Sequence, residues 1–222
     1  QNNLSNDRQT LFRPSDVCVG ADGAIYISDW YDKRTGGHQD TDETCSGTIY
    51  RIAPKGFKPK IPAINYDTVE GQLAALQSPV NNVRHVGFTR LKEAGEKILP
   101  QVLKLRDNAN PYFASRAVWL AAQLGERGLI ATRSWLENED AMKRLVALRA
   151  IRAATDDGLD LIAAMSGDHS PMVRREVAVA LRDVPAAQSV PLLAKLARHI
   201  DGSDRSLLEA WGIGCSGKEV EV

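Results

Sequence analysis

Apolar and polar residues alternate in two different ways along the chain. Asp16–Val19 alternates with a period of two, and Ala24–Asp29 is rich in β-forming residues. Gly20–Gly23 lies between them and has the composition of a tight turn, so the two runs predict a β-hairpin. A third such run, Thr48–Ile52, follows a longer polar stretch. The pattern therefore predicts a small three-stranded antiparallel meander.

From Asp67 onward, apolar residues recur every three or four positions, as expected for amphipathic helices. An arginine that opens a run of apolar helical turns returns at a nearly fixed interval, at Arg84, Arg116, Arg144, Arg174 and Arg205. A fixed period between about 20 and 50 residues is typical of stacked repeat arrays. We expect a mainly α protein, an α-solenoid of about five helical hairpins, each burying its apolar stripe against the next.

The boundaries of these elements follow from the same pattern. Lys55–Tyr66 is rich in proline and predicts an extended linker, which divides the chain into residues 1–66 and 67–222. The helices are predicted to form five pairs, the first of which starts at Asp67. The other four pairs are Glu96–Arg106 with Pro111–Leu124, Leu129–Leu136 with Asp140–Ala154, Leu159–Met165 with Pro171–Arg182, and Ser189–His199 with Asp204–Trp211.

The ends of the helical region give further expectations. Asp67-Thr68-Val69-Glu70 offers an N-cap and acidic residues for the first turn of the first helix, and Gly212 and Gly214 are predicted to end the last one. No second apolar element follows within Lys218–Val222, which predicts an array that is cut rather than capped. Because the sequence starts at Gln1 without methionine or signal peptide, we expect a processed or excised piece of a longer protein.

Charge and hydropathy exclude some classes of function. The 28 basic and 28 acidic residues balance, with a pI near 7.1, so the chain lacks the basic footprint of a nucleic-acid-binding protein. No apolar run reaches the roughly 18 residues that a membrane-spanning helix needs. The three cysteines form no zinc or c-type haem motif.

Two parts of the sequence resemble a known family. Phe12–Val17, Gly20–Gly23, Ile25–Asp32 and Gly47–Ile52 resemble the last blade of a β-propeller, and the helical pairs resemble HEAT repeats, chiefly where Val83-Arg84 and Val173-Arg174 open second helices. The closest resemblance is to sorbosone-dehydrogenase-like, membrane-bound-dehydrogenase-type proteins of planctomycetes. In that family a quinoprotein-type propeller precedes HEAT repeats and often a c-type cytochrome domain. Here most of the propeller and the haem motif are absent.

The resemblance implies a role and a location. We expect a non-catalytic scaffold of a periplasmic or secreted, propeller-type sugar or alcohol dehydrogenase-like protein. PQQ and haem c are then expected in the parent protein rather than in this chain. The partners would be other blades or a cytochrome domain, with a protein partner on the solenoid. The alternative is a free-standing HEAT-like interaction module in which the meander is only a cap.

One acidic loop is the candidate metal site. Asp32, His38, Asp40 and Asp42 lie around a Gly-Gly pair, and oxygen ligands on a flexible loop suit calcium. The glycine and terminal glutamate of an EF-hand are missing. A solvated polar loop, or a loop that contacts a sugar or a quinone directly, is the alternative interpretation.

The remaining candidates are cysteines, arginines and aromatic residues. The oxidising compartment implied by the resemblance suggests a Cys18–Cys45 disulfide, with two buried thiols as the alternative, while Cys215 has no evident partner. We expect the repeated arginines to cap carbonyls or to pair with acidic residues of a neighbouring repeat. Trp119, Trp135 and Trp211 are expected in the core. No histidine has a serine or cysteine that the sequence places beside it, so no nucleophile–base pair is predicted.

Overall fold

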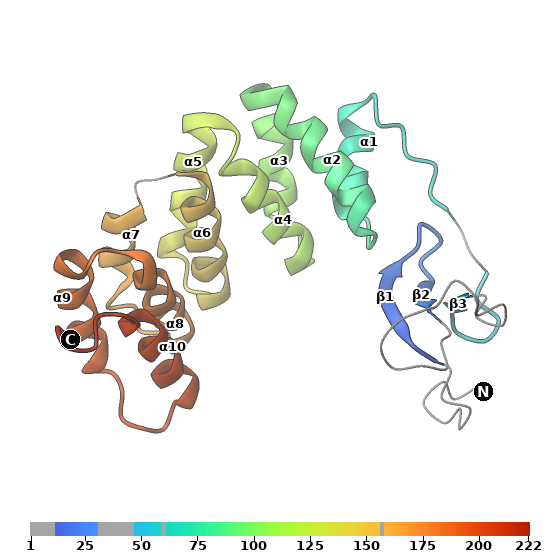
Figure 1. Cartoon of the computed structure of the whole chain (residues 1–222). Helices are drawn as coiled ribbons and strands as arrows, with labels where there is room; N and C mark the ends of the chain where they lie inside the picture. The colour runs from blue at the N-terminus through green and yellow to red at the C-terminus, as the bar shows by residue number, and fades with distance from the viewer. Residues whose placement is uncertain (1–11, 31–46, 59–60, 156–157) are drawn as a thin grey trace. The chain divides into compact units, whose positions relative to one another are not determined.

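The computed structural model describes residues 12–30, 47–58, 61–155 and 158–222 (Figure 1). It is mainly helical after a small three-stranded antiparallel sheet. The chain divides into two compact units, residues 1–90 and 91–222, which are described separately below. The predicted division at residues 66 and 67 stays a prediction. The metal loop lies outside the described residues, and so does Cys45.

The meander forms as the alternation predicted. Its strands are β1 (Pro14–Val19), β2 (Ile25–Asp29) and β3 (Thr48–Ile52), paired in the order β1-β2-β3. The turn between β1 and β2 closes through a hydrogen bond from the Gly20 N–H to the Ala24 carbonyl. Gly23 has a φ of 82°, which glycine adopts without steric cost, and this explains the Asp-Gly pair in the turn.

The first helix of the helical region belongs to the same unit. Helix α1 spans Val69–Gln77, and α2 begins at Asn81 and ends at Ala94, in the second unit. The N-cap of α1 is Thr68, whose hydroxyl accepts a hydrogen bond from the Gly71 N–H. This confirms the N-cap predicted within Asp67–Glu70, with Glu70 as the acidic residue in the first turn.

The second unit continues the alternation of helices. The elements are η2 (Gly95–Ile98), α3 (Leu99–Arg106), α4 (Pro111–Ala121), α5 (Gly125–Arg133), η3 (Ser134–Glu137), α6 (Ala141–Ala154), α7 (Gly158–Met165), α8 (Pro171–Ala180), η4 (Leu181–Asp183), α9 (Ala186–Ala197) and α10 (Arg205–Cys215). The predicted helices all exist, with shifted boundaries. The prediction that glycines end the last helix was wrong, because α10 runs through Gly212 and Gly214 to Cys215.

The core of this unit follows the helix order. The even-numbered helices α4, α6, α8 and α10 pack on one another in sequence, and each odd-numbered helix packs on the even one that follows it. A large apolar cluster joins α6 to α10 and includes Leu148, Ile151, Val177 and Leu193. A smaller cluster, rich in alanine, joins α4 to α6. Trp135 is buried, and Trp119 and Trp211 pack against these clusters, which confirms their expected place in the core.

Candidate functional site

One turn geometry recurs before each even-numbered helix. A side-chain oxygen accepts a hydrogen bond from the backbone N–H two positions later. This arrangement is an Asx or Ser turn, which ends one helix and sets the direction of the next. The five acceptors are Ser78, Asn108, Asn138, Asp168 and Asp201. Their spacing of about 30 residues lies within the range of stacked repeat arrays and varies less than that of the arginines. The turn is therefore the most regular feature of the repeat.

Three of the repeated arginines close these turns. Arg84 donates to the carbonyls of Ser78 and Pro79, which lie six and five positions earlier, at 3.0 and 2.6 Å. Arg144 makes the same two contacts, to Asn138 and Glu139, at 2.8 and 2.9 Å. These contacts confirm the predicted capping of carbonyls.

The remaining arginines show how far the pattern extends. Arg174 is the third that closes its turn, donating to the Asp168 carbonyl, again six positions earlier, at 2.7 Å. Arg116 lies over the ring of Phe113. Arg205 is exposed and pairs with Glu209 on its own helix, so the prediction does not extend to the last arginine.

Arg144 also makes the other contact predicted for these arginines, an ion pair with an acidic residue of the neighbouring repeat. Its Nε and Nη2 atoms donate to the two carboxylate oxygens of Asp168, both at 2.8 Å, and both side chains are almost fully buried. The same Nη2 lies 3.1 Å from Nε2 of His169. Burial alone would raise the pKa of Asp168, but the hydrogen bonds from Arg144 and Ser170 outweigh burial and hold that pKa below its ordinary value.

Further ion pairs cross the grooves between even-numbered helices. Glu176 of α8 accepts from Arg149 and Arg152 of α6, at 2.7 and 3.2 Å. Arg175 of α8 pairs with Asp204, the N-cap of α10, at 2.9 Å. Ion pairs therefore link α6 to α8 and α8 to the start of α10.

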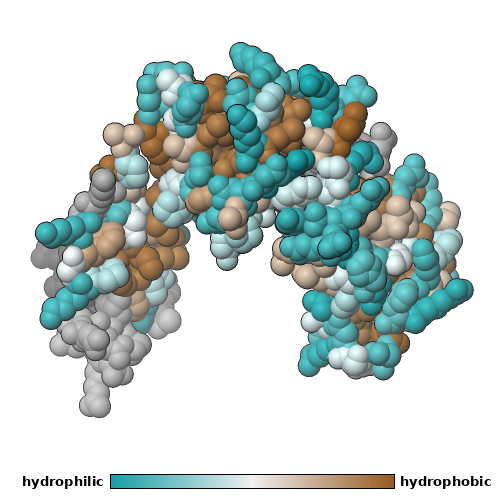
Figure 2. All heavy atoms as spheres, turned by 180° about the vertical axis from the view of Figure 1, so that it is seen from behind, coloured by the Kyte–Doolittle hydropathy of each residue, from teal (hydrophilic) through white to brown (hydrophobic). Residues whose placement is uncertain are grey.

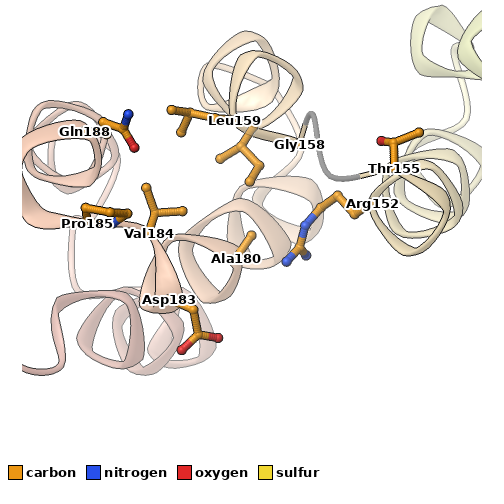
Figure 3. A pocket seen from close by; sticks show the side chains of 10 residues that line it. Arg152, Thr155, Gly158, Leu159, Ala180, Asp183, Val184, Pro185 and Gln188 are labelled. Carbon is orange, nitrogen blue, oxygen red and sulfur yellow. The ribbon is translucent and has the colours of Figure 1, made fainter.

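A cleft of about 330 Å³ lies among α6, α7, α8 and α9 (Figure 3). Its apolar lining includes Leu159, Ile162 and Val184, and its polar groups include those of Arg152, Asp183 and Gln188. The described lining residues include no histidine or cysteine, and the guanidinium of Arg152 already has Glu176 as a partner. The lining therefore combines apolar side chains with polar and charged ones.

The meander has an apolar face that stays exposed. Pairing across the strands places Val17, Val19, Ile25, Ile27, Tyr50 and Ile52 on one side of the sheet. Val17 is 64% exposed and Ile52 40%. Figure 2 shows hydrophobic residues gathered over the meander, at the lower left. Such side chains normally lie against a second layer.

The opposite side of the meander is tied together by one carboxylate. Asp22, in the turn between β1 and β2, accepts hydrogen bonds from the Tyr26 hydroxyl and from Arg51 of β3. Its pKa lies below the ordinary value, chiefly because the carboxylate also accepts a hydrogen bond from the Ala24 N–H. This carboxylate therefore links the hairpin turn to the third strand.

The residues predicted to bind a metal ion lie in a part of the chain that the structure does not describe. Asp32, His38, Asp40 and Asp42 lie outside the described residues, so calcium binding stays a prediction. Among the residues that the structure describes, no group of three or more histidine, cysteine, aspartate or glutamate side chains is arranged for a metal ion.

The predicted disulfide also includes a residue outside the described part of the chain. Cys18 is exposed on β1, and no disulfide joins described residues. Because Cys45 lies outside them, the Cys18–Cys45 bond also stays a prediction. Cys215 is buried, and burial raises the pKa of its thiol.

Two lysines were not singled out by the sequence. Lys218 is buried, and its Nζ donates to the carbonyls of Leu181, Arg182 and Gly214, at 2.6, 2.9 and 3.4 Å. It thus holds carbonyls of η4 and of α10. Lys195 donates to the buried hydroxyl of Ser166, which itself donates to the Ala163 carbonyl. That hydroxyl is therefore held in the core.

No helix among the described residues is long and apolar enough to cross a membrane. A comparison of the sequence with protein-family models and with curated proteins finds no match.

Proposed function

We propose that this chain is a non-catalytic scaffold and protein-interaction region built as a HEAT-like α-solenoid of about five helical hairpins. The observation that carries the proposal is the recurrence of one turn, closed in three repeats by an arginine. Each hairpin then contacts mainly its neighbours, as helices α4 to α10 do. Such an array offers a long, regular surface for a partner.

The exposed apolar side chains of the meander support the proposal that this chain is part of a larger propeller-type protein. A propeller blade is covered on both faces by its neighbours, and this meander has apolar side chains uncovered by described residues on both faces, Val17 on one and Ile49 on the other. The proposed parent is the periplasmic or secreted, propeller-type sugar or alcohol dehydrogenase-like protein of the family that the sequence resembles. Catalysis with PQQ, and electron transfer through haem c, would belong to other parts of that parent.

Truncation tests the solenoid. A chain that ends at Thr155 keeps whole hairpins, whereas a chain that ends at Ser170 leaves α7 without α8. We expect the first to unfold cooperatively in urea, with a denaturant dependence reduced in proportion to the part removed. In the second chain, the amide hydrogens of α7 should exchange with solvent without protection. Loss of all cooperative unfolding in the first chain would show a single indivisible domain and refute the proposal.

The coding sequence around residues 1–222 tests the context. Further blades before Gln1, each with a turn and strand like Gly20–Asp29, would support the dehydrogenase-like parent. A start codon or secretion signal directly before Gln1 would refute that parent. The free-standing interaction module, with the meander as a cap, would then be the function.

A further inference from the structure

A single buried side chain attaches the segment that follows α10 to the rest of the second unit. This segment, residues 216–222, is called the strap below. Lys218 is its buried residue, with 7% of its surface exposed. The other residues of the strap are all exposed, and Val220 is 97% exposed. The strap therefore has one anchor and little apolar packing.

A tight turn reverses the chain just before this lysine. Ser216 has φ −52° and ψ 122°, and Gly217 has φ 76°, which are the angles of a type II turn. Such a turn needs a positive φ at its third position, where glycine has no steric cost. The turn closes through a hydrogen bond of 2.8 Å from the Lys218 N–H to the Cys215 carbonyl. The strap therefore folds back onto the end of α10.

The anchor is an ammonium group among three carbonyls. The Nζ atom of Lys218 donates to the carbonyls of Leu181 and Arg182 in η4, which lie 37 and 36 positions earlier, and to the Gly214 carbonyl in α10. Carbonyls at the end of a helix lack intrahelical donors and carry partial negative charge, so a cation suits them. One ammonium group therefore joins η4 to the end of α10.

The other hydrogen bonds of the strap are local. The Gly217 N–H donates to the Glu219 carboxylate, and the N–H groups of the last two residues donate to the Lys218 carbonyl. The N–H groups of Ser216 and Lys218 donate to the last turn of α10. Among hydrogen bonds between described residues, only those from Lys218 Nζ to η4 connect the strap to an element other than α10. Their loss would free the strap without breaking a bond inside α8.

The strap lies beside the thiol of the last residue of α10. Cys215 is 6% exposed and belongs to the large apolar cluster. Burial raises the pKa of its thiol, the charge of Glu219 also raises that pKa, and the charge of Lys218 lowers it. Both strap residues therefore lie near the sulfur. Because Cys215 is the last residue of its helix, release of the strap uncovers this end of the helix.

We propose that the strap opens and closes as a unit about its Lys218 anchor, exposing the Cys215 thiol while α8 and the rest of α10 stay folded. Segments with few buried contacts open at a lower cost in free energy than the core does. The closed strap shields the thiol and three carbonyls, and the open strap presents them to solvent. This conformational switch does not depend on the scaffold function proposed above.

Thiol labelling of the full chain tests the proposal. N-ethylmaleimide reacts with accessible thiols, and mass spectrometry follows the peptide that contains Cys215. We expect labelling at least about tenfold slower than in the unfolded chain, because the anchor keeps the strap closed. The labelling should still be faster than global unfolding allows. Its rate should change little at low urea concentrations, because opening of the strap exposes little surface.

Three variants then test the anchor and the turn. Lys218→Met removes the ammonium group and should speed the labelling of Cys215 by about tenfold or more. Gly217→Ala should speed it by about threefold, because alanine is strained at a φ of 76° and its Cβ would meet nothing within 4 Å. The control is Lys195→Met, which removes a lysine contact to Ser166 and leaves the anchor in place, so the rate should change less than about twofold. Circular dichroism checks that each variant is folded.

Three results would overturn the inference. Labelling with the full urea dependence of unfolding would mean that the thiol is exposed only when the whole unit unfolds. Labelling as fast as in the unfolded chain would mean that the strap does not shield Cys215. Equal rates in Lys218→Met and Lys195→Met would mean that Lys218 is not the anchor. None of these results bears on the truncation test, so the strap can fail while the scaffold stands.

Discussion

The guanidinium of Arg144 forms a bidentate pair with Asp168, donating two hydrogen bonds of 2.8 Å to its two carboxylate oxygens. The two residues belong to successive repeats, and the same guanidinium also holds two carbonyls of its own turn. One side chain thus joins a turn to the next repeat. Bidentate arginine–carboxylate pairs of this kind are strong and geometrically specific.

Removing this arginine should destabilise the fold strongly. Arg144→Ala leaves the buried carboxylate of Asp168 and the carbonyls of Asn138 and Glu139 without their donor, and breaking a buried pair typically costs about 3–5 kcal/mol. Urea unfolding followed by circular dichroism measures the loss. Arg205→Ala is the matched control, because its pair with Glu209 is exposed and should contribute less than about 0.5 kcal/mol. Equal losses in the two variants would contradict the role of the buried pair.

The same pair should make stability depend on pH in acid. The pKa of Asp168 in the folded state lies below its ordinary value, so the folded protein binds fewer protons than the unfolded one near that pH. The contribution is therefore complete above about pH 4, near the unfolded pKa, and is lost as pH falls through the folded pKa. We expect the stability difference between the natural chain and Asp168→Asn to be constant from pH 7 to 5. Below about pH 4 it should shrink, and a difference unchanged down to pH 3 would be evidence against the linkage.

The elements of this fold could be predicted because they depend on local patterns. The strands Pro14–Val19 and Ile25–Asp29 follow from alternation around an Asp-Gly turn, and the helices follow from three-and-four spacing. The roles of Arg84 and Arg144 were predicted because capping of nearby carbonyls is also local. The metal loop, the disulfide and the propeller context came from composition and resemblance, and they stay predictions.

The recurring turn was not evident in the sequence because its acceptor changes from repeat to repeat. The acceptor is a serine at Ser78, an asparagine at Asn108 and an aspartate at Asp168, so no single letter recurs. A search for any short polar side chain with a repeat-like period would have found it. The cap by Lys218 could not be found in this way, because it joins parts of the chain that are far apart in sequence.

The Cys18–Cys45 bond has a direct chemical test. Cys18 is exposed on β1, so a partner can reach its sulfur. If the bond forms, alkylation in denaturant without reductant should label only Cys215, and mass spectrometry would count one added group. The closed loop of about 27 residues would stabilise the meander by roughly 3 kcal/mol in the chain-entropy model. Three added groups would mean that both cysteines are reduced.

Lys218 should matter more than its place near the C-terminus suggests. Lys218→Met keeps most of the apolar stem but removes the donor for the Leu181 and Arg182 carbonyls, which should cost about 1–3 kcal/mol. The control is Lys195→Met, which removes a single contact to Ser166 and should cost about 1 kcal/mol or less. Chemical denaturation compares the two. A smaller loss in Lys218→Met than in Lys195→Met would mean that the cap contributes little.

Two glycines of α10 should respond to alanine in opposite ways. A Cβ at Gly214 would lie 2.5 Å from the Ala178 carbonyl oxygen and 2.8 Å from the Leu193 side chain, because α10 packs closely on α8 there. Gly214→Ala should therefore destabilise by about 1–3 kcal/mol. A Cβ at Gly212 would meet nothing within 4 Å, so Gly212→Ala should stabilise by about 0.5–1 kcal/mol through helix propensity alone.

The two glycine variants separate the effect of packing between α10 and α8 from the effect of helix propensity within α10. The sequence had predicted that both glycines end the last helix, yet α10 continues through them to Cys215. If the helix did end there, alanine at either position would have no helix propensity to supply and no neighbouring helix to meet. Thermal unfolding of the two variants decides between these possibilities. A shift of the melting temperature in the same direction for both would mean that α10 does not pack on α8 through Gly214, because only that contact makes the two positions differ.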